Sequence, residues 1–379
     1  MDFGWCDRQR ELYRRTLDEV REVFADGEPV PEGFFGPKEW RALGALGLLG
    51  ASVPREFGGG GLGALDTALA MEALGRGCPR TGLVFAAGAH LFACAMPIAD
   101  FGADELRNRV LPGMCDGQLV AGNAMTETGA GSDVARLSVT AERAEGGWIL
   151  NGDKSFVSNG PVADLLVTYA TTDPKAGHLG VTAFVVEAGT AGLTVSAPLE
   201  KMGLLACPAG SVRFTDCFVP DGDVLGEPGQ GGGIFQHSMG WERTCLFAGY
   251  VGLADRILDQ CVEHARERRQ FGRPIASFQA VSHRLAEMKL RVESARLLLY
   301  RACWELDRNG RATVFTPLSK LAVSEGVLSS VVDAVRLFGG RGYLRPDGVE
   351  AALRDAVPSV VFSGTSDIQR ELIAKEMGL

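Results

Sequence analysis

The hydrophobic pattern of this 379-residue chain changes its period twice, near residues 120 and 226. Before the first change and after the second, apolar residues recur every three or four positions, which indicates amphipathic helices. Between the changes, short alternating stretches are separated by turns such as Asn151-Gly152, which indicates antiparallel strands. An α–β–α order without βαβ alternation argues against a doubly wound fold. The pattern predicts an α+β protein with an N-terminal helical domain (1–120), a middle β domain (121–225) and a C-terminal helical bundle (226–379).

Composition narrows the class of protein further. Hydrophobic residues make up 46% and charged residues 22%, as in an ordinary globular protein, and the net charge of −9 argues against binding to nucleic acid or to an anionic membrane. The nine cysteines are scattered, without a CxxC motif or a Cys/His cluster, so we expect neither a metal site nor a disulfide framework. An odd number of cysteines is typical of reduced thiols in the cytoplasm.

Two segments could be mistaken for targeting or membrane sequences. The N-terminus, MDFGWCDRQRELYRRT, carries charges throughout, so we do not expect it to be a signal peptide. The longest apolar stretch, residues 83–99, has 17 residues and contains His90 and Pro97. A bilayer span needs about 20 residues, so this stretch predicts a buried helix instead.

The glycine-rich runs at 58–63 and 229–233 do not lie between a strand and a helix, so they do not predict a Rossmann motif. Three other segments could hold a nucleotide. In MTETGAGSDVARL (125–137), small residues expose backbone N–H groups that suit a phosphate or the polar edge of a ring. KSFVSNG (154–160) offers an aromatic ring, and RRQFGRP (268–274) offers three arginines and a phenylalanine. Taken singly, each could equally be a turn, a strand or a solvated basic face.

Taken together and in this order, these segments resemble the acyl-CoA dehydrogenase family over nearly the whole chain. The matching motifs are TETGAGSD (126–133), FVSNG (156–160), RRQFGRPIASFQAVSHRLAEM (268–288), LFGGRGY (337–343) and SGTSDIQR (363–370). The resemblance implies an N-terminal helical domain, a middle antiparallel β-barrel and a C-terminal four-helix bundle, which agrees with the α–β–α order. It also implies a homotetramer with one FAD per subunit.

The resemblance assigns FAD contacts to individual residues. Contacts to the isoalloxazine and pyrophosphate fall on Met125, Thr126, Gly131 and Ser132. Beside the flavin, the positions of the family's usual Trp and Thr are occupied by Phe156 and Ser158. Contacts to the FAD of a neighbouring subunit fall on Arg268, Phe271, Gln279, Arg336, Gly339 and Gly340, and the site is completed by Thr365 and Asp367. Because the resemblance divides each FAD site between two subunits, it implies that cofactor binding depends on oligomerisation.

The family's reaction is α,β-dehydrogenation of an acyl thioester. A carboxylate removes the α-proton while a hydride leaves the β-carbon for flavin N5, and hydrogen bonds to the thioester carbonyl stabilise the enolate-like charge. Most of the family has Glu immediately before the Gly-Thr of the C-terminal loop, whereas this chain has Ser363. A serine hydroxyl cannot take an α-proton, so the resemblance leaves Ser363 a role through its backbone N–H only.

Glu242 offers a replacement for the missing loop carboxylate. It begins an apolar helix face that continues through Leu246, Gly249, Leu253 and Ile257. A carboxylate on such a face is desolvated, and its pKa rises toward a value useful for a general base. Glu242-Arg243 resembles the isovaleryl-CoA dehydrogenase-like branch, whose base precedes an arginine. The alternative is a carboxylate that interacts with the helix dipole or with Arg243. Because the loop carries Ser363, we predict that Glu242 is the base and that Arg243, Phe362 and Gly364 contact the substrate.

The substrate carrier is indicated by subfamily features. The stretch MGWERTCLFAGY, together with Leu205 and Cys207 where relatives have Arg and Ser, resembles secondary-metabolism enzymes that desaturate acyl or prolyl groups on carrier proteins. We therefore expect an acyl- or peptidyl-carrier-protein thioester, with a CoA thioester as the alternative. The electron acceptor would be an electron-transfer flavoprotein or oxygen.

Two other classes of function stay open. One is a flavin monooxygenase of the N-oxygenase type on the same fold, against which the SGTSDIQR loop and Glu242 argue. The other is a non-catalytic FAD-binding protein that has lost its loop carboxylate. Failure of every thioester to reduce the flavin would favour this second alternative.

Overall fold

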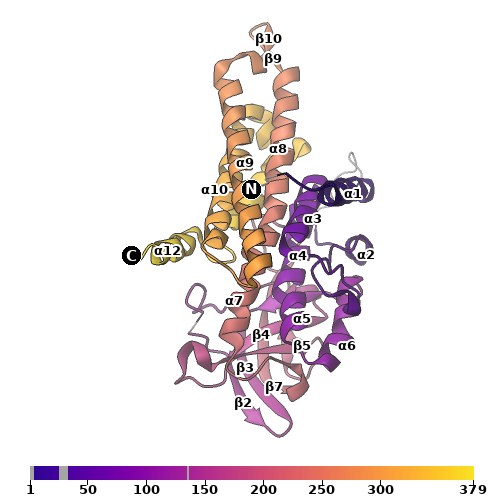
Figure 1. The fold of residues 1–379 in the computed structure, drawn as a ribbon, viewed down its shortest axis with the longest axis vertical. Coiled ribbons are helices and arrows are strands. Elements are labelled where there is room, and N and C mark those ends of the chain that lie inside the picture. The colour runs from indigo at the N-terminus through magenta and orange to yellow at the C-terminus, as the bar shows by residue number, and fades with distance from the viewer. Residues whose placement is uncertain (1–3, 25–32, 135) are drawn as a thin grey trace.

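The computed structural model describes residues 4–24, 33–134 and 136–379. Residues 1–3 and 25–32 of the expected N-terminal domain, and Ala135 of the expected middle domain, lie outside the described residues. Figure 1 shows an elongated molecule whose large β-sheet lies at one end and whose longest helices extend to the other. The segment with strand periodicity therefore forms one end of the molecule, and segments with helical periodicity form the rest.

Helices form most of the described N-terminal part. They are α1 (Asp7–Val23), α2 (Pro37–Ala45), α3 (Ala64–Gly77), α4 (Thr81–His90), α5 (Met96–Phe101) and α6 (Asp104–Cys115). A π-helical segment, Leu91–Ala95, joins α4 to α5, so that Thr81–Phe101 is one continuous helical stretch. This stretch is long and apolar enough for a bilayer, but its apolar window is wholly buried inside the protein. The prediction of a buried helix at 83–99 is confirmed.

In the described part of the chain, the middle part is one eight-stranded sheet with the order β6-β7-β3-β2-β4-β5-β8, and β1 pairs with β4. The strands are β1 (Ala121–Ala124), β2 (Thr140–Ala144), β3 (Gly147–Ser158), β4 (Leu165–Thr171), β5 (Val181–Glu187), β6 (Leu193–Val195), β7 (Ala209–Pro220) and β8 (Val224–Leu225). Alternate residues of β3 and β7 point into a core of their own, which includes Leu150, Val157, Val212 and Phe214.

The expectation of a purely antiparallel sheet needs one correction. β1 pairs in parallel with β4, from Ala121 opposite Leu165 to Ala124 opposite Thr168, and β2 adds a single parallel bridge to β4. The remaining pairs of neighbouring strands within the described sheet are antiparallel. The cause is topological. β1 and β2 both run parallel to β4, so the long connection between them, residues 125–139, brings the chain back in the same direction instead of forming a hairpin.

Long helices form the C-terminal part. They are α7 (Gly231–Trp241), α8 (Phe247–Glu267), α9 (Gln279–Asn309), α10 (Phe315–Phe338), α11 (Val349–Ala356) and α12 (Ser366–Glu376). α8, α9 and α10 pack on one another, and α11 and α12 pack against α10. A short hairpin of β9 (Arg269–Gln270) and β10 (Arg273–Pro274) connects α8 to α9 at the end of the bundle farthest from the sheet (Figure 1).

Close contact between α3 and α8 holds the first turns of α8 against the N-terminal part. A Cβ added to Gly75 would lie 2.0 Å from the carbonyl oxygen of Gly249, and one added to Gly252 would lie 2.2 Å from that of Glu72. No side chain fits such distances, so glycine allows the two helix backbones to touch. The residues just before Phe247 are therefore held at the junction of the N-terminal and C-terminal parts.

Candidate functional site

Glu242 lies at this junction, in an unusual stretch of backbone. It begins a π-helical segment, Glu242–Leu246, between α7 and α8. This segment packs against the other π-helical segment, Leu91–Ala95. The Thr244 hydroxyl donates to the Gly240 carbonyl at 2.7 Å, so this carbonyl keeps a partner in the widened helix. Because π-helical turns are rare and frequent at functional sites, the backbone alone marks Glu242 as a candidate site residue.

The Glu242 carboxylate is buried, and one of its two oxygens has a hydrogen-bond partner among the described residues. Only 8% of the residue is exposed. Its Oε2 accepts a hydrogen bond from the Ser363 hydroxyl at 2.7 Å, whereas its Oε1 is buried without a hydrogen-bond partner among the described residues. Burial raises the pKa of Glu242 to about 7, against the opposing effects of the Ser363 hydrogen bond and the Arg243 charge. A carboxylate with such a pKa can be ionised at neutral pH and still accept a proton efficiently.

The loop that carries Ser363 is held by side chains from both sides. Arg243 donates from Nε to the Ser363 carbonyl at 2.9 Å, and Gln369 donates from Nε2 to the Gly364 carbonyl at 2.9 Å. Thr365 caps α12, because its hydroxyl accepts from the Ile368 N–H at 3.2 Å. Arg243, expected at the substrate, therefore contacts the loop directly, and Gly364 lies beside it.

Two of these contacts are not predicted by the sequence. The resemblance left Ser363 only its backbone N–H, yet its hydroxyl binds the proposed base. Gln369 was not singled out at all, although it is fully buried and hydrogen-bonded to the loop. Its position one turn into the last helix, four residues after a threonine N-cap, is the signal that could have identified it.

Phe362 lies in an aromatic cluster beside the loop. Its ring centroid is 4.7 Å from that of Phe85, 5.3 Å from that of Phe247 and 5.9 Å from that of Tyr250. These rings come from α4 and α8 and occupy the space next to Ser363. Phe362 and Phe85 are half-buried, so the cluster presents apolar ring surface beside the loop, whereas Phe247 and Tyr250 are buried.

The first two segments expected to contact FAD lie side by side. The Ser155 N–H donates to the Thr126 carbonyl at 2.8 Å, and the Thr128 and Ser155 hydroxyls are hydrogen-bonded at 2.9 Å. Met125 is buried, Thr126 is half-buried, and Gly131 and Ser132 of the same turn are exposed. This surface loop therefore runs along the edge of β3.

A bulge in β3 directs Phe156 outward. The register between β3 and β7 shifts between Lys154 and Val157, and Phe156 within this bulge has a φ of 58°. Its side chain is 66% exposed, and Ser158 at the end of the strand is half-buried. Bulges commonly redirect a side chain beside an active site. An exposed aromatic ring in a disfavoured backbone conformation fits the edge or face of a flat ligand.

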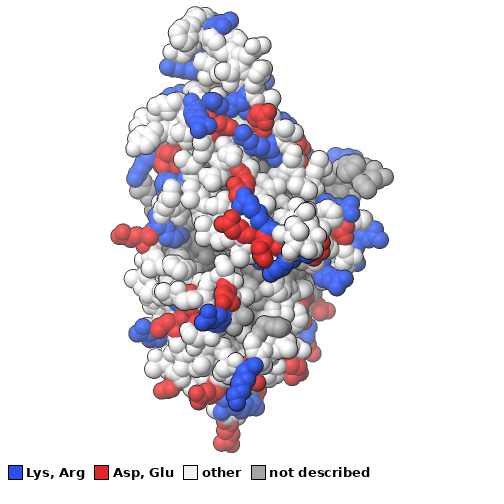
Figure 2. Space-filling model, turned by 90° about the vertical axis from the view of Figure 1, so that its left-hand side faces the viewer, with Lys and Arg blue, Asp and Glu red and all other residues white. Residues whose placement is uncertain are grey.

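The residues expected to contact the FAD of a neighbouring subunit lie at the far end of the bundle. Arg268, Phe271, Gln279, Arg336, Gly339 and Gly340 are exposed there, near the β9–β10 hairpin (Figure 1). The rings of His264 and Phe338, 4.1 Å apart, join the ends of α8 and α10, and Phe271 is 92% exposed with a φ of 51°. Lys and Arg predominate over Asp and Glu at this end in Figure 2. One chain therefore does not bring the two sets of residues together.

These surfaces fit FAD in chemistry. A Cβ added to Gly129, Gly131, Gly339 or Gly340 would meet no atom within 4 Å, so the backbone there is open to a ligand. Exposed backbone N–H groups and arginines suit a pyrophosphate, and exposed phenylalanines suit a flavin or adenine ring. Thr365 and Asp367, at the start of α12, lie on the same loop as Ser363.

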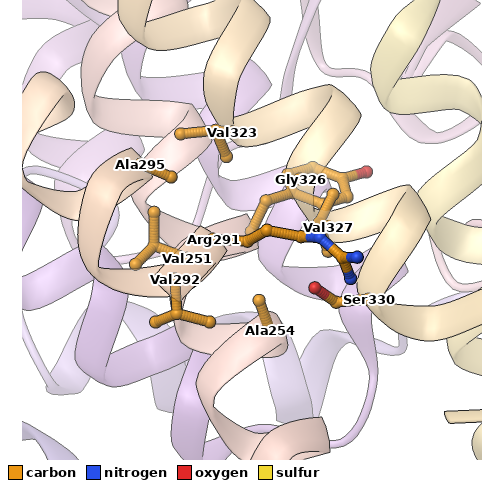
Figure 3. A pocket seen from close by; sticks show the side chains of 10 residues that line it. Val251, Ala254, Arg291, Val292, Ala295, Val323, Gly326, Val327 and Ser330 are labelled. Carbon is orange, nitrogen blue, oxygen red and sulfur yellow. The ribbon is translucent and has the colours of Figure 1, made fainter. Parts of the chain in front are cut away.

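A separate cavity lies inside the bundle, between α8, α9 and α10 (Figure 3). Its walls are mostly apolar, with Val251, Val292 and Val327 among the lining residues, and Arg291 and Ser330 add polar groups. Neither Glu242 nor Ser363 lines it. We therefore assign the chemistry to the junction around Glu242 and not to this cavity.

Three domain models of one family match the chain. They are described as the N-terminal, middle and C-terminal domains of acyl-CoA dehydrogenase, and they match residues 7–118, 122–217 and 229–378. Together they span most of the sequence. The chain belongs to the acyl-CoA dehydrogenase family.

Individual relatives match from end to end. An L-prolyl-[peptidyl-carrier protein] dehydrogenase of Pseudomonas fluorescens is 53% identical over 380 residues, which are 100% of both chains. Among solved structures, the FAD complex of PigA is 42% identical, has a TM-score of 0.97 and is covered over 100% of both chains. The prolyl acyl carrier protein oxidase AnaB is 38% identical with a TM-score of 0.96, covering 99% of this chain and 100% of that one.

Proposed function

We propose that this chain is an FAD-dependent dehydrogenase that oxidises an aminoacyl thioester on a carrier protein, with a prolyl group as the first candidate. Support comes from relatives that are named for prolyl groups on carrier proteins and match the whole chain. The single observation that carries the chemistry is the buried Glu242 carboxylate, which has one oxygen hydrogen-bonded and the other without a hydrogen-bond partner among the described residues.

In this proposal, Glu242 removes the α-proton of the thioester. Oε1 forms the new O–H bond as the Cα–H bond breaks, and the electron pair of that bond passes into the enolate. FAD, once bound, would supply the acceptor for the hydride of the β-carbon. The Ser363 backbone N–H donates to the thioester carbonyl and stabilises the enolate-like charge. Arg243 and Gln369 hydrogen-bond to the loop and so fix the position of this N–H relative to the Glu242 carboxylate.

The aromatic cluster supports a small substrate. Phe362 and Phe85, only half-buried, present apolar ring surface beside the loop, and Phe247 and Tyr250 close the space behind them. A five-membered ring fills such a space with apolar contact on both faces. We therefore place the prolyl ring between this cluster and the flavin.

The active form in this proposal is a homo-oligomer, with a tetramer expected. Residues assigned to FAD lie at opposite ends of one chain. In this proposal a second copy therefore supplies Arg268 and the β9–β10 hairpin to the FAD site of the first. Leu290 and Leu297, seven residues apart on one face of α9, are 60% and 51% exposed and offer apolar surface for such contacts.

All nine cysteines are free thiols, which supports a reducing compartment such as the cytoplasm.

A stopped-flow comparison tests the substrate. The FAD-loaded protein is mixed anaerobically with prolyl-carrier protein, prolyl-CoA or isovaleryl-CoA, and loss of flavin absorbance is followed. We expect the prolyl-carrier protein to reduce the flavin fastest. Equal or faster reduction by a CoA ester would contradict the carrier assignment, and no reduction by any thioester would contradict the dehydrogenase proposal. Reoxidation with oxygen or with an electron-transfer flavoprotein then identifies the acceptor.

A further inference from the structure

The Ser363 side chain does more than fill the place of a loop carboxylate. Its hydroxyl donates to Glu242 Oε2 at 2.7 Å and so links the C-terminal loop to the π-helical segment between α7 and α8. The other carboxylate oxygen, Oε1, is buried without a partner among the described residues. The hydroxyl thus distinguishes two oxygens that are chemically equivalent in a free carboxylate.

The backbone of Ser363 is arranged for this contact. Its φ of 54° lies in the left-handed region, which favours glycine over residues with a Cβ. Arg243 Nε at 2.9 Å from the Ser363 carbonyl, and Gln369 Nε2 at 2.9 Å from the Gly364 carbonyl, hold the turn in this conformation. A glycine would adopt the turn with less strain but would offer no hydroxyl.

Other groups around Glu242 do not supply an equivalent donor. The Arg243 guanidinium donates from Nε to the Ser363 carbonyl. The Cys94 thiol and the Tyr169 hydroxyl, from Leu91–Ala95 and β4, are near enough for the Glu242 charge to add to the effect of burial in raising their pKa values. Both groups stay neutral at neutral pH. Lys320 on α10 faces Arg243 and the Phe247 ring, and its pKa is lowered to about 8 by burial and by Arg243.

We propose that Ser363 is a positioning residue for the proton-abstracting carboxylate. Its hydroxyl binds Oε2 of Glu242, stabilises the ionised carboxylate in a buried site and leaves Oε1 as the oxygen that accepts the α-proton. Ser363 itself exchanges no proton. This inference rests on the proposed role of Glu242 and assigns the side chain of the loop residue a part in the reaction, in addition to its backbone N–H.

The test is the pH dependence of flavin reduction by prolyl-carrier protein in Ser363→Ala and Ser363→Gly. The wild-type rate should rise with pH through about 7, because the base must be deprotonated. Without the hydroxyl, the midpoint should move upward by about one pH unit and the rate at pH 7 should fall about fivefold, with KM little changed. Ser363→Gly separates loss of the hydroxyl from backbone strain, since both variants should show the same shift.

Ser359→Ala is the matched control, because Ser359 is a buried serine just before the loop whose hydroxyl has no hydrogen-bond partner among the described residues. It should leave the pH profile unchanged. An unchanged midpoint in both Ser363 variants, or an equal shift in Ser359→Ala, would overturn the proposal.

A second readout does not depend on turnover. Infrared titration of the resting protein, with Glu242→Gln to identify the band, reports the ionisation of Glu242 directly. The band should titrate at higher pH in Ser363→Ala than in the wild type, and coincident titrations would overturn the proposal. If no thioester reduces the wild-type flavin but this shift is present, the proposed function fails while the hydrogen bond is upheld.

Discussion

At the scale of single residues, the ion pair of Lys154 and Glu127 holds the loop that carries Met125 and Thr126. Lys154 is fully buried and donates to the Met125 carbonyl at 3.0 Å and to Glu127 at 2.8 Å. The Glu127 carboxylate also accepts from the Ser138 N–H at 2.6 Å. Burial acts to raise the pKa of Glu127, but the hydrogen bonds from Lys154 and Ser138 outweigh it and lower this pKa. The pair is therefore charged, and each partner depends on the other.

We expect Lys154→Met to lower the free energy of unfolding by about 3–5 kcal/mol, because it leaves the Glu127 carboxylate buried without its cation. Urea unfolding measures this change. Adding Glu127→Gln should restore part of the loss. The matched control is Lys289→Met, which removes an exposed partner of Glu293 on α9 and should cost less than about 1 kcal/mol. Equal losses for Lys154 and Lys289 would contradict a structural role for the buried pair.

The same scale shows what the sequence can and cannot predict about the site. The placement of Glu242 on a buried face follows from apolar residues at helical spacing, and the structure confirms that the carboxylate is buried. The hydrogen bond from Ser363 does not follow from any local pattern. It depends on a left-handed φ that is maintained by Arg243 and Gln369, one of which is distant in sequence.

At the scale of elements, periodicity predicts the buried helix at 83–99 and the strands of the middle part. It does not predict the two π-helical segments, Leu91–Ala95 and Glu242–Leu246, because one extra residue in a turn barely alters an apolar stripe. Nor does it predict the parallel pairing of β1 with β4, since strand direction is decided by distant connections. Both features lie close to the proposed site, where local rules are commonly broken.

At the scale of the whole molecule, the FAD assignments require more than one copy of the chain. The β3 edge and the β9–β10 hairpin lie at opposite ends of the structure (Figure 1). Family resemblance predicts which residues belong to the cofactor site. In one chain these residues form two separate surfaces, which can meet at one FAD only when two chains associate. Cofactor retention and subunit assembly should therefore be coupled.

We expect Arg268→Ala to weaken FAD binding by about 1.5–3 kcal/mol, because a phosphate loses a charge-assisted hydrogen bond from a neighbouring subunit. Fluorescence titration of the apoprotein with FAD measures the affinity, and sedimentation measures assembly. Arg266→Ala is the control, since Arg266 is also exposed at the end of α8 but carries no assigned contact. Unchanged affinity in Arg268→Ala would show that the hairpin does not reach the cofactor.

The central claim is that Glu242 supplies the base and that the C-terminal loop positions it. Anaerobic flavin reduction by one reducing thioester, compared between Glu242→Gln and Ser363→Ala, tests this claim most directly. Glu242→Gln should retain the fold and FAD but lose reduction by at least about 10²–10⁴-fold, whereas Ser363→Ala should lose only about fivefold at pH 7. Fast reduction in Glu242→Gln together with abolished reduction in Ser363→Ala would contradict the account.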